Sequence, residues 1–226
     1  MSEPLPPRPK VRWEAHYADE VGEEAVVFTT DGTELRTIIR GVRLAGLSPD
    51  LLRAEGAGAL PEGARLKFQD GWLHGYLVVV AIPVVLAMGS KELPAVVKVS
   101  WDDRGPLPAP RSGVPTLVVQ DGERALEVKS DGEDFEGAIP RMEQQLPGGS
   151  FLKACFNCQY ADYGVGGSQA FGSMYCFRRL KVPYLAVRTK SEYLDLFEKG
   201  LDIEMTQETY LCPEFSRRTP GTGYRG

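Results

Sequence analysis

Four cysteines near the C-terminal end of the chain are the residues whose type and spacing could do chemistry. They follow the pattern C-x2-C-x17-C-x35-C and are Cys155, Cys158, Cys176 and Cys212. A two-residue gap lets both sulfurs of a tight turn point at one centre, which is why structural zinc sites use it. The third and fourth cysteines stand alone, so the fold must bring them to the first pair. We therefore expect one metal site with these four ligands and Zn²⁺ as the metal.

Three other interpretations of the cysteines stay open. Cys212 is followed by Pro213, and a Cys-Pro ending occurs in ferredoxin-type ligand sets, so an iron–sulfur cluster is the alternative cofactor. A thiol redox pair would need Cys155 and Cys158 at the start of a helix after a strand. No parallel β-α-β pattern surrounds them. The last interpretation is four unrelated core cysteines.

We predict no catalytic residue. The histidines, His16 and His74, both fall in expected strands, where their positions offer no nucleophile as a partner. The glycine-rich loop at 164–172 lacks the Lys-Ser/Thr of a phosphate-binding loop, so we interpret it as a tight turn that serves the cysteines. Charged residues close to the cysteines in sequence are expected to form hydrogen bonds and ion pairs around them; they are Asp162, Arg178, Glu208 and Glu214.

The C-terminal segment is rich in arginine, tyrosine and glycine. Tyrosine and arginine are the residue types most often found as interface anchors. We therefore expect this segment to dock onto the cysteine region or to bind a protein partner or ligand. The candidate binding residues are Arg178, Arg217, Arg218, Tyr224 and Arg225.

The elements that must position these residues begin with short β-like runs from Val11 to about Lys129. Asp-Gly occurs between such runs at 31–32, 70–71 and 121–122, and this pair is typical of hairpin turns. The apolar stretch 75–89 is shorter than the roughly 20 residues of a membrane-spanning helix. We interpret it as two buried strands broken at Pro83. Together these patterns predict an antiparallel β sandwich.

The spacing of apolar residues then changes to that of helices. It predicts a helix at 133–147 that contains Pro140, and a second at 190–199. Thr189 and Glu192 would form a capping box at the start of the second helix. After it, a strand should lead into Cys212. The resulting fold class is α+β, in three parts: an extended proline-rich tail at 1–10, an antiparallel β sandwich with a closing helix at 11–147, and a four-cysteine metal-binding module at 148–226.

Composition narrows the functional class. The chain has 226 residues, of which 25% are charged, and a net charge of −5, which argues against a general nucleic-acid binder. We expect no membrane association and a cytoplasmic location, where disulfides are rare and clustered cysteines more often bind metal.

The segments around the cysteines resemble an uncharacterised bacterial domain family, actinobacterial in character. The resemblance rests on C-x2-C-x-Y-x-D-Y at 155–163, F-G-x3-C-F-R at 171–178, and the late Cys-Pro. It covers residues 150–226 best. No established activity comes with it, so it implies no catalytic residues, and it adds support for the cysteines acting together.

These observations predict a cytoplasmic, non-enzymatic binding or interaction protein stabilised by a structural zinc site. The alternative is an iron–sulfur or zinc-dependent enzyme or redox protein that uses the same cysteines.

Overall fold

The computed structural model describes residues 6–56, 61, 63–105, 113–121, 124–130, 134–167 and 171–224. Within them, one antiparallel sheet of ten strands has the order β11-β10-β9-β8-β1-β2-β3-β4-β5, with β12 pairing on β8. The strands are β1 (Val11–Asp19), β2 (Gly22–Thr30), β3 (Leu35–Ile39), β4 (Val42–Gly46), β5 (Leu52–Ala54), β8 (Tyr76–Met88), β9 (Lys91–Asp102), β10 (Thr116–Asp121), β11 (Arg124–Lys129) and β12 (Phe151–Leu152). A separate hairpin is formed by β6 (Lys67–Gln69) and β7 (Trp72–His74).

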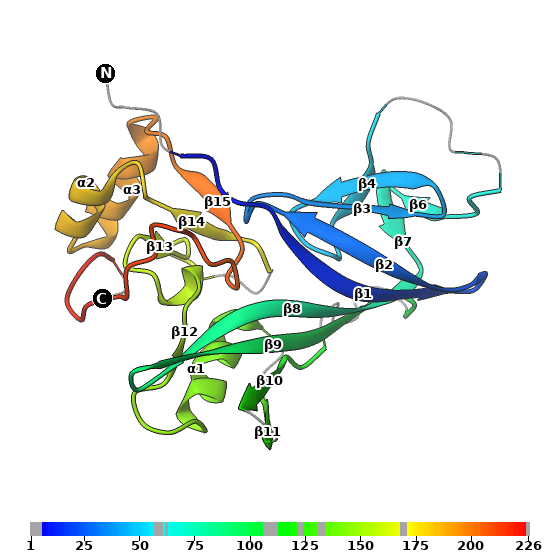
Figure 1. Ribbon diagram of the computed structural model, residues 1–226. Coiled ribbons are helices and arrows are strands. Elements are labelled where there is room, and N and C mark those ends of the chain that lie inside the picture. Colours follow the sequence, from blue (N-terminus) through cyan, green and yellow to red (C-terminus); the bar gives the residue numbers. More distant parts are fainter. Residues whose placement is uncertain are drawn as a thin grey trace.

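The predicted antiparallel, mainly β architecture is confirmed, and its division into two sheets is corrected. β1 pairs with β2 along one edge and with β8 along the other, which joins the two halves into a single sheet. The sheet bends, so that β3 and β4 lie above β8 and β9 in the view of Figure 1. The hydrophobic core fills the space it encloses, with Trp13, Phe28 and Trp101 among its largest buried side chains.

β8 is one continuous strand, so the predicted break at Pro83 is wrong. Pro83 pairs with Val96 of β9. On the other edge of β8, pairing with β1 ends at Ala81 and pairing with β12 begins at Leu86. The proline therefore lies where that edge has no ladder partner, so its missing N–H removes no bond from the sheet.

Turn chemistry accounts for several hairpins. Asp70 and Gly71 have φ of +53° and +83° and join β6 to β7 as the expected two-residue turn. The Asp31-Gly32 site does join β2 to β3, through a four-residue loop at 31–34. Gly122 of the third Asp-Gly pair lies outside the described residues. A further turn, at Arg40-Gly41, joins β3 to β4, although no Asp-Gly pair marks it in the sequence.

The helices follow their sequence signals closely. α1 (Phe135–Gln144) starts at Asp134, whose side chain accepts from the backbone N–H of Gly137, and it contains Pro140 as predicted. α3 (Lys190–Glu198) has the predicted capping box of Thr189 and Glu192. α2 (Lys181–Ala186) was not predicted. No helix in the described ranges is long and apolar enough to cross a membrane.

The C-terminal part packs on the end of the sheet (Figure 1). Its own small sheet is formed by β13 (Ala161–Asp162), β14 (Met174–Cys176) and β15 (Glu204–Thr206). A 3₁₀ turn, η1 (Cys155–Asn157), packs in the same core as the large sheet, and so do three of the cysteines: Cys155, Cys158 and Cys212. A second apolar cluster around Phe177, Tyr184 and Tyr193 holds α2 and α3. The division into domains stays a prediction.

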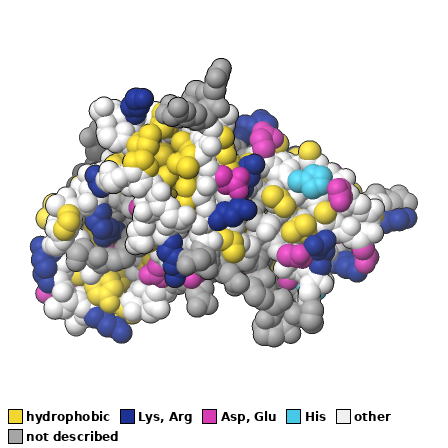
Figure 2. Space-filling view, turned by 90° about the horizontal axis from the view of Figure 1, so that it is seen from below, with side chains coloured by type: hydrophobic (Ala, Val, Ile, Leu, Met, Phe, Trp, Pro, Cys, Tyr) yellow, Lys and Arg dark blue, Asp and Glu magenta, His cyan; other side chains and the backbone are white. Residues whose placement is uncertain are grey.

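The two ends of the described chain lie in this C-terminal part. Residues 6–10 run beside β15 (Figure 1), and Arg8 among them is buried. On the face seen in Figure 2, hydrophobic side chains form one larger patch and several smaller groups, and charged side chains of both signs are spread between them.

Candidate functional site

Cys155 and Cys158 form a tight turn at the end of the large sheet. The N–H of Cys158 donates to the carbonyl of Cys155 at 3.0 Å, which closes the 3₁₀ turn between them. Asn157, inside the turn, is held by its side-chain amide, which donates to Glu143 Oε1 at 2.6 Å and to the Leu152 carbonyl at 2.9 Å. The tight turn predicted for the C-x2-C pair therefore forms, and these hydrogen bonds hold it in place.

Backbone hydrogen bonds bring the other two cysteine-bearing segments to this turn. The N–H of Cys155 donates to the carbonyl of Tyr210 at 2.8 Å, two residues before Cys212. Cys176 pairs with Ala161 on one side and with Glu204 on the other. All four cysteines are buried and unpaired. The structure thus gathers three segments that are far apart in the sequence.

Backbone N–H groups stand close to three of the four sulfurs. The N–H of Glu214 donates to Cys212 Sγ at 3.3 Å. The N–H groups of Tyr160 and Ser216 favour the ionised form of Cys158, and that of Arg178 favours the ionised form of Cys176. Such bonds favour the ionised form of an acceptor, so these turns are suited to thiolates.

A cation lies within electrostatic range of each sulfur. Arg8 acts on Cys155 and Cys176, Arg218 acts on Cys158, and Lys181 acts on Cys212. Arg8 is the residue that the sequence had not indicated, because it stands in a proline-rich segment expected to be a free tail. Its guanidinium donates to Thr206 Oγ1 at 2.8 Å, and this hydroxyl lies 3.5 Å from Cys155 Sγ.

As free thiols, Cys155, Cys158 and Cys176 would be neutral at pH 7. Burial, followed by the neighbouring cysteines, raises the pKa of Cys155 far above its ordinary value and raises that of Cys158. Burial also raises the pKa of Cys176, to about 11. A redox pair needs an accessible thiolate, so these shifts argue against the thiol redox interpretation.

The metal site itself stays a prediction. In the part of the chain that the structure describes, no three His, Cys, Asp or Glu side chains are placed so as to hold a metal ion between them. A metal module is therefore not shown.

Acidic side chains connect the cations around the cysteines. Glu204 pairs with Arg8 at 2.9 Å and with Arg178 at 3.1 Å. Glu214 pairs with Lys181 at 2.7 Å and with Arg178 at 3.7 Å. Arg178, predicted as a binding residue, is 8% exposed, and these pairs occupy it inside the protein.

The predicted binding residues of the C-terminal segment make internal contacts. The guanidinium of Arg217 lies over the ring of Phe151 at 4.0 Å, and its side chain is exposed. Arg218 donates to the carbonyls of Cys158 and Ala161. Tyr224 stacks on Tyr193 with ring centroids 4.7 Å apart. Arg225 lies outside the described residues.

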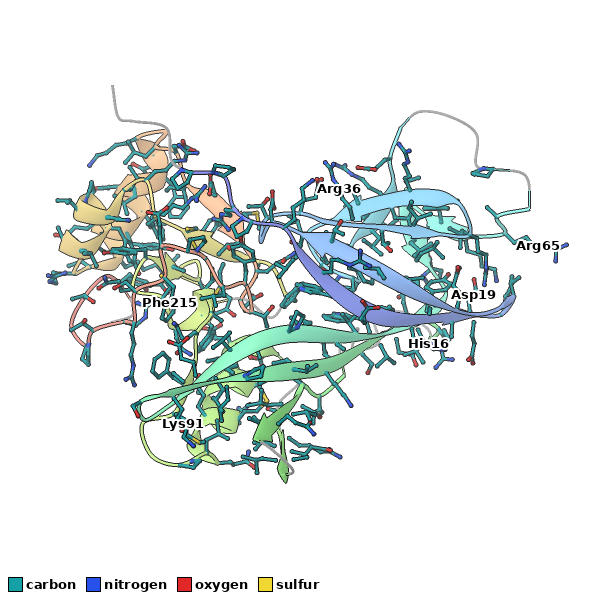
Figure 3. All side chains as sticks on the ribbon, in the orientation of Figure 1. His16, Asp19, Arg36, Arg65, Lys91 and Phe215 are labelled. Carbon is teal, nitrogen blue, oxygen red and sulfur yellow. The ribbon has the colours of Figure 1, made fainter. Side chains whose placement is uncertain are left out.

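These contacts dock the segment onto the cysteine region, which was one of the two expectations for it. Phe215 extends the same packing and stacks on Phe151 with centroids 6.4 Å apart. Figure 3 shows Phe215 between the C-terminal segment and the β8–β9 ribbon. Binding of a partner by this segment stays a prediction.

Glu208 and the glycine-rich loop form a buried support for the cysteine turn. The N–H of Gly172 donates to Glu208 Oε2 at 2.7 Å, and the Tyr163 hydroxyl donates to Oε1 at 3.1 Å. Burial raises the pKa of Glu208 to about 7. Residues 168–170 of the loop lie outside the described residues.

The two histidines lie in the large sheet and the β6–β7 hairpin. His16 contacts Glu23 at 3.0 Å on the exposed face of β1, where Figure 3 labels it. His74 Nδ1 contacts Asp103 Oδ2 at 2.6 Å. Four charged neighbours share a cavity of about 360 Å³ with this pair, and each of them forms an ion pair.

Residues 11–161 match a family of unknown function (DUF6304). The matched range ends just after Cys158, so it covers the large sheet and the first cysteine pair, whereas the resemblance had been expected to be best at 150–226. No curated protein and no solved structure matches the chain.

Proposed function

The chain belongs to this family of unknown function, and we propose that it is a non-enzymatic binding protein whose C-terminal part is held together by one structural zinc ion. The ligands are Cys155, Cys158, Cys176 and Cys212. A structural zinc ion on four thiolates would fix the 3₁₀ turn, β14 and the C-terminal segment to one another, and so keep the end of the large sheet covered.

The observation that carries the proposal is the surroundings of the four sulfurs. The backbone N–H of Glu214 donates to Cys212, other backbone N–H groups favour the ionised forms of Cys158 and Cys176, and three cations bring positive charge to all four sulfurs: Arg8, Arg218 and Lys181. A neutral thiol needs neither these N–H groups nor these cations. Four thiolates with one Zn²⁺ carry a net negative charge, which these cations and N–H dipoles would offset.

Zinc binding requires the four sulfurs to converge on one point more closely than they do in this structure. Cysteine has a single side-chain torsion, and a change between its staggered rotamers moves the sulfur while the backbone stays in place. The backbone bonds that join the three segments would therefore be kept during binding.

A site with four protein ligands has no open coordination position for water or substrate. This favours a structural over a catalytic metal, and hence a non-enzymatic protein. The proposal includes a cytoplasmic location, because unpaired clustered cysteines are typical of reducing compartments.

The test compares thermal unfolding of the wild type and Cys155→Ser, each with and without a strong chelator. Structural zinc in small modules contributes on the order of 10 kcal/mol, so the chelator should lower the wild-type Tm by more than about 10 °C. Cys155→Ser should start from the lowered Tm and show no further response. An unchanged Tm in the chelated wild type would refute the structural zinc ion. Brown protein with visible absorption would replace zinc by an iron–sulfur cluster.

A further inference from the structure

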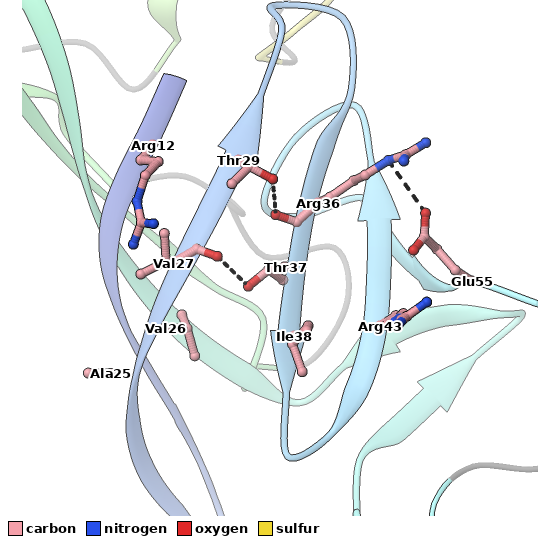
Figure 4. Close-up of a pocket in the computed structure, with 10 residues that line it drawn as sticks. All are labelled: Arg12, Ala25, Val26, Val27, Thr29, Arg36, Thr37, Ile38, Arg43 and Glu55. Atoms are coloured by element: carbon pink, nitrogen blue, oxygen red, sulfur yellow. Dashed lines mark hydrogen bonds and ion pairs between the residues drawn. The ribbon is translucent and has the colours of Figure 1, made fainter. Parts of the chain in front are cut away.

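β2 and β3 separate from one another after the start of their hairpin. Their ladder has two pairs, Thr29 with Arg36 and Thr30 with Leu35. Beyond them the strands diverge, as Figure 4 shows. The backbone carbonyl of Val27 accepts from the Thr37 hydroxyl at 3.0 Å instead of from a backbone N–H of β3. Part of the facing edges of β2 and β3 is thus left outside the ladder.

The space between these strands is a cavity of about 510 Å³. Residues from both faces of the sheet line it. Val27 and Ile38 point to the outer face, whereas Val26 and Thr37 are buried on the inner face. The backbone of these two inner residues can line an opening on the outer face, so the cavity is an outer-face groove that follows the gap between the two strands. We call it the β2–β3 slot.

Positive charge flanks the slot on both sides. Arg12 of β1 lies beside Thr29, and Arg43 of β4 lies beside Ile38. Both arginines line the slot and are exposed. Neither has an ion-pair partner among the described residues. Arg36, the third arginine at the slot, is held by Glu34 at 2.6 Å and by Glu55 at 3.5 Å.

An apolar side chain also stands at the opening. Ile38 is 59% exposed, although it is a large hydrophobic residue in the middle of a strand. Strand edges outside a ladder, unpaired cations and an exposed apolar residue are the features by which proteins capture extended peptides: the backbone gives affinity, and alternate side chains give specificity.

We propose that the β2–β3 slot binds an extended acidic segment of a partner protein. The segment lies extended in the slot, with carboxylates at Arg12 and Arg43 and an apolar side chain on Ile38. The proposal rests on the binding role given above and names the surface and partner class for it. It does not depend on the metal, since none of the residues that line the slot is a cysteine.

The test measures fluorescence anisotropy of two labelled synthetic peptides, one alternating Val and Glu and the other alternating Val and Lys. The full-length protein should bind the acidic peptide and not the basic one. Arg12→Gln with Arg43→Gln should weaken binding by about tenfold or more, and added salt should do the same. Ile38→Glu, which places a like charge at the opening, should also abolish binding.

The matched control is Lys91→Gln with Lys190→Gln, which removes the same charge from exposed sites far from the slot. Its affinity should equal that of the wild type. Absence of acidic-peptide binding, equal binding of both peptides, or an equal effect of the control pair would overturn the proposal. Zinc content measured on the same samples separates the peptide-binding proposal from the zinc proposal. Protein that contains zinc but does not bind the peptide would refute peptide binding by the slot. Protein that binds the peptide but contains no zinc would refute the structural zinc site.

Discussion

Arg8 and Glu204, 196 residues apart in the sequence, form an ion pair of 2.9 Å at the edge of the cysteine cluster. The pair ties the N-terminal segment to β15. The side chain of Arg8 is 3% exposed, so its charge is removed from water and depends on its neighbours. Two of those neighbours are Cys155 and Cys176. The N-terminal segment thereby becomes part of the environment of the cysteines.

Arg8→Met should destabilise the protein because it removes this pair and the bond to Thr206. Glu204 keeps Arg178 as a partner, so the expected loss is about 1.5–3 kcal/mol, the range for a lost hydrogen bond to a charged group. Urea unfolding measures it. Arg12→Met, at an exposed site, should stay within about 0.5 kcal/mol of the wild type. Equal losses in the two variants would mean that the N-terminal segment is not docked.

Gly223→Ala should undock the C-terminal segment. Gly223 has φ of +70°, and a Cβ there would meet the Tyr184 hydroxyl at 2.6 Å, where that hydroxyl donates to Asp162. Gly221→Ala is the matched control: its φ is +78°, and a Cβ there meets nothing within 4 Å. Both variants bear the strain of a positive φ, about 1–2 kcal/mol.

The difference between the two glycine variants isolates the clash. Gly223→Ala should cost about 1–3 kcal/mol more in free energy of unfolding, the range for forced overpacking. Limited proteolysis should then cleave it faster near the C-terminus. If both variants unfold and cleave alike, the packing of this segment against Tyr184 is wrong.

Glu208 should make the protein less stable as the pH rises towards 8. Its pKa is raised from the ordinary 4.5 to about 7 by burial, so the folded protein holds a proton that the unfolded chain releases between these values. Its stabilising contribution is complete below about pH 4.5 and is lost as the pH rises through about 7. The change is on the order of a few kcal/mol.

Glu208→Gln keeps an oxygen acceptor and cannot ionise, so its stability should depend less on pH. The measurement is the urea midpoint at several pH values between 5.5 and 8, with the wild type and the variant compared at each. Other titrating groups, including Glu143, whose pKa burial also raises, contribute to both proteins and cancel. Parallel pH profiles would contradict the assignment to Glu208.

Local signals in the sequence were enough to predict local structure. The Asp70-Gly71 turn and the Thr189–Glu192 capping box each depend on a few neighbouring residues, and both form as expected. The strand order could not be predicted in this way. That β1 pairs with β8 depends on residues 57 to 67 positions apart, and no short pattern encodes it.

The same distinction holds at the cysteines. Their types and spacing indicated a shared site, because C-x2-C is a local device. Arg8 and Thr206 could not be found from the sequence, since each reaches the site through the tertiary fold. The predicted strand break at Pro83 was wrong for a related reason. A proline disrupts a strand only where another residue at that position would donate a backbone N–H to a neighbouring strand. Which positions do so depends on the partner strands, and these are set by the tertiary fold.

The metal content of freshly purified full-length protein tests the central claim most directly. Elemental analysis should find one zinc per chain in the wild type and much less in Cys176→Ser and Cys212→Ser, whose cysteines come from separate segments. A thiol reagent should label the native wild type only after the metal is removed. Folded protein that holds neither zinc nor iron, and unfolds at the same temperature with and without chelator, would contradict the account.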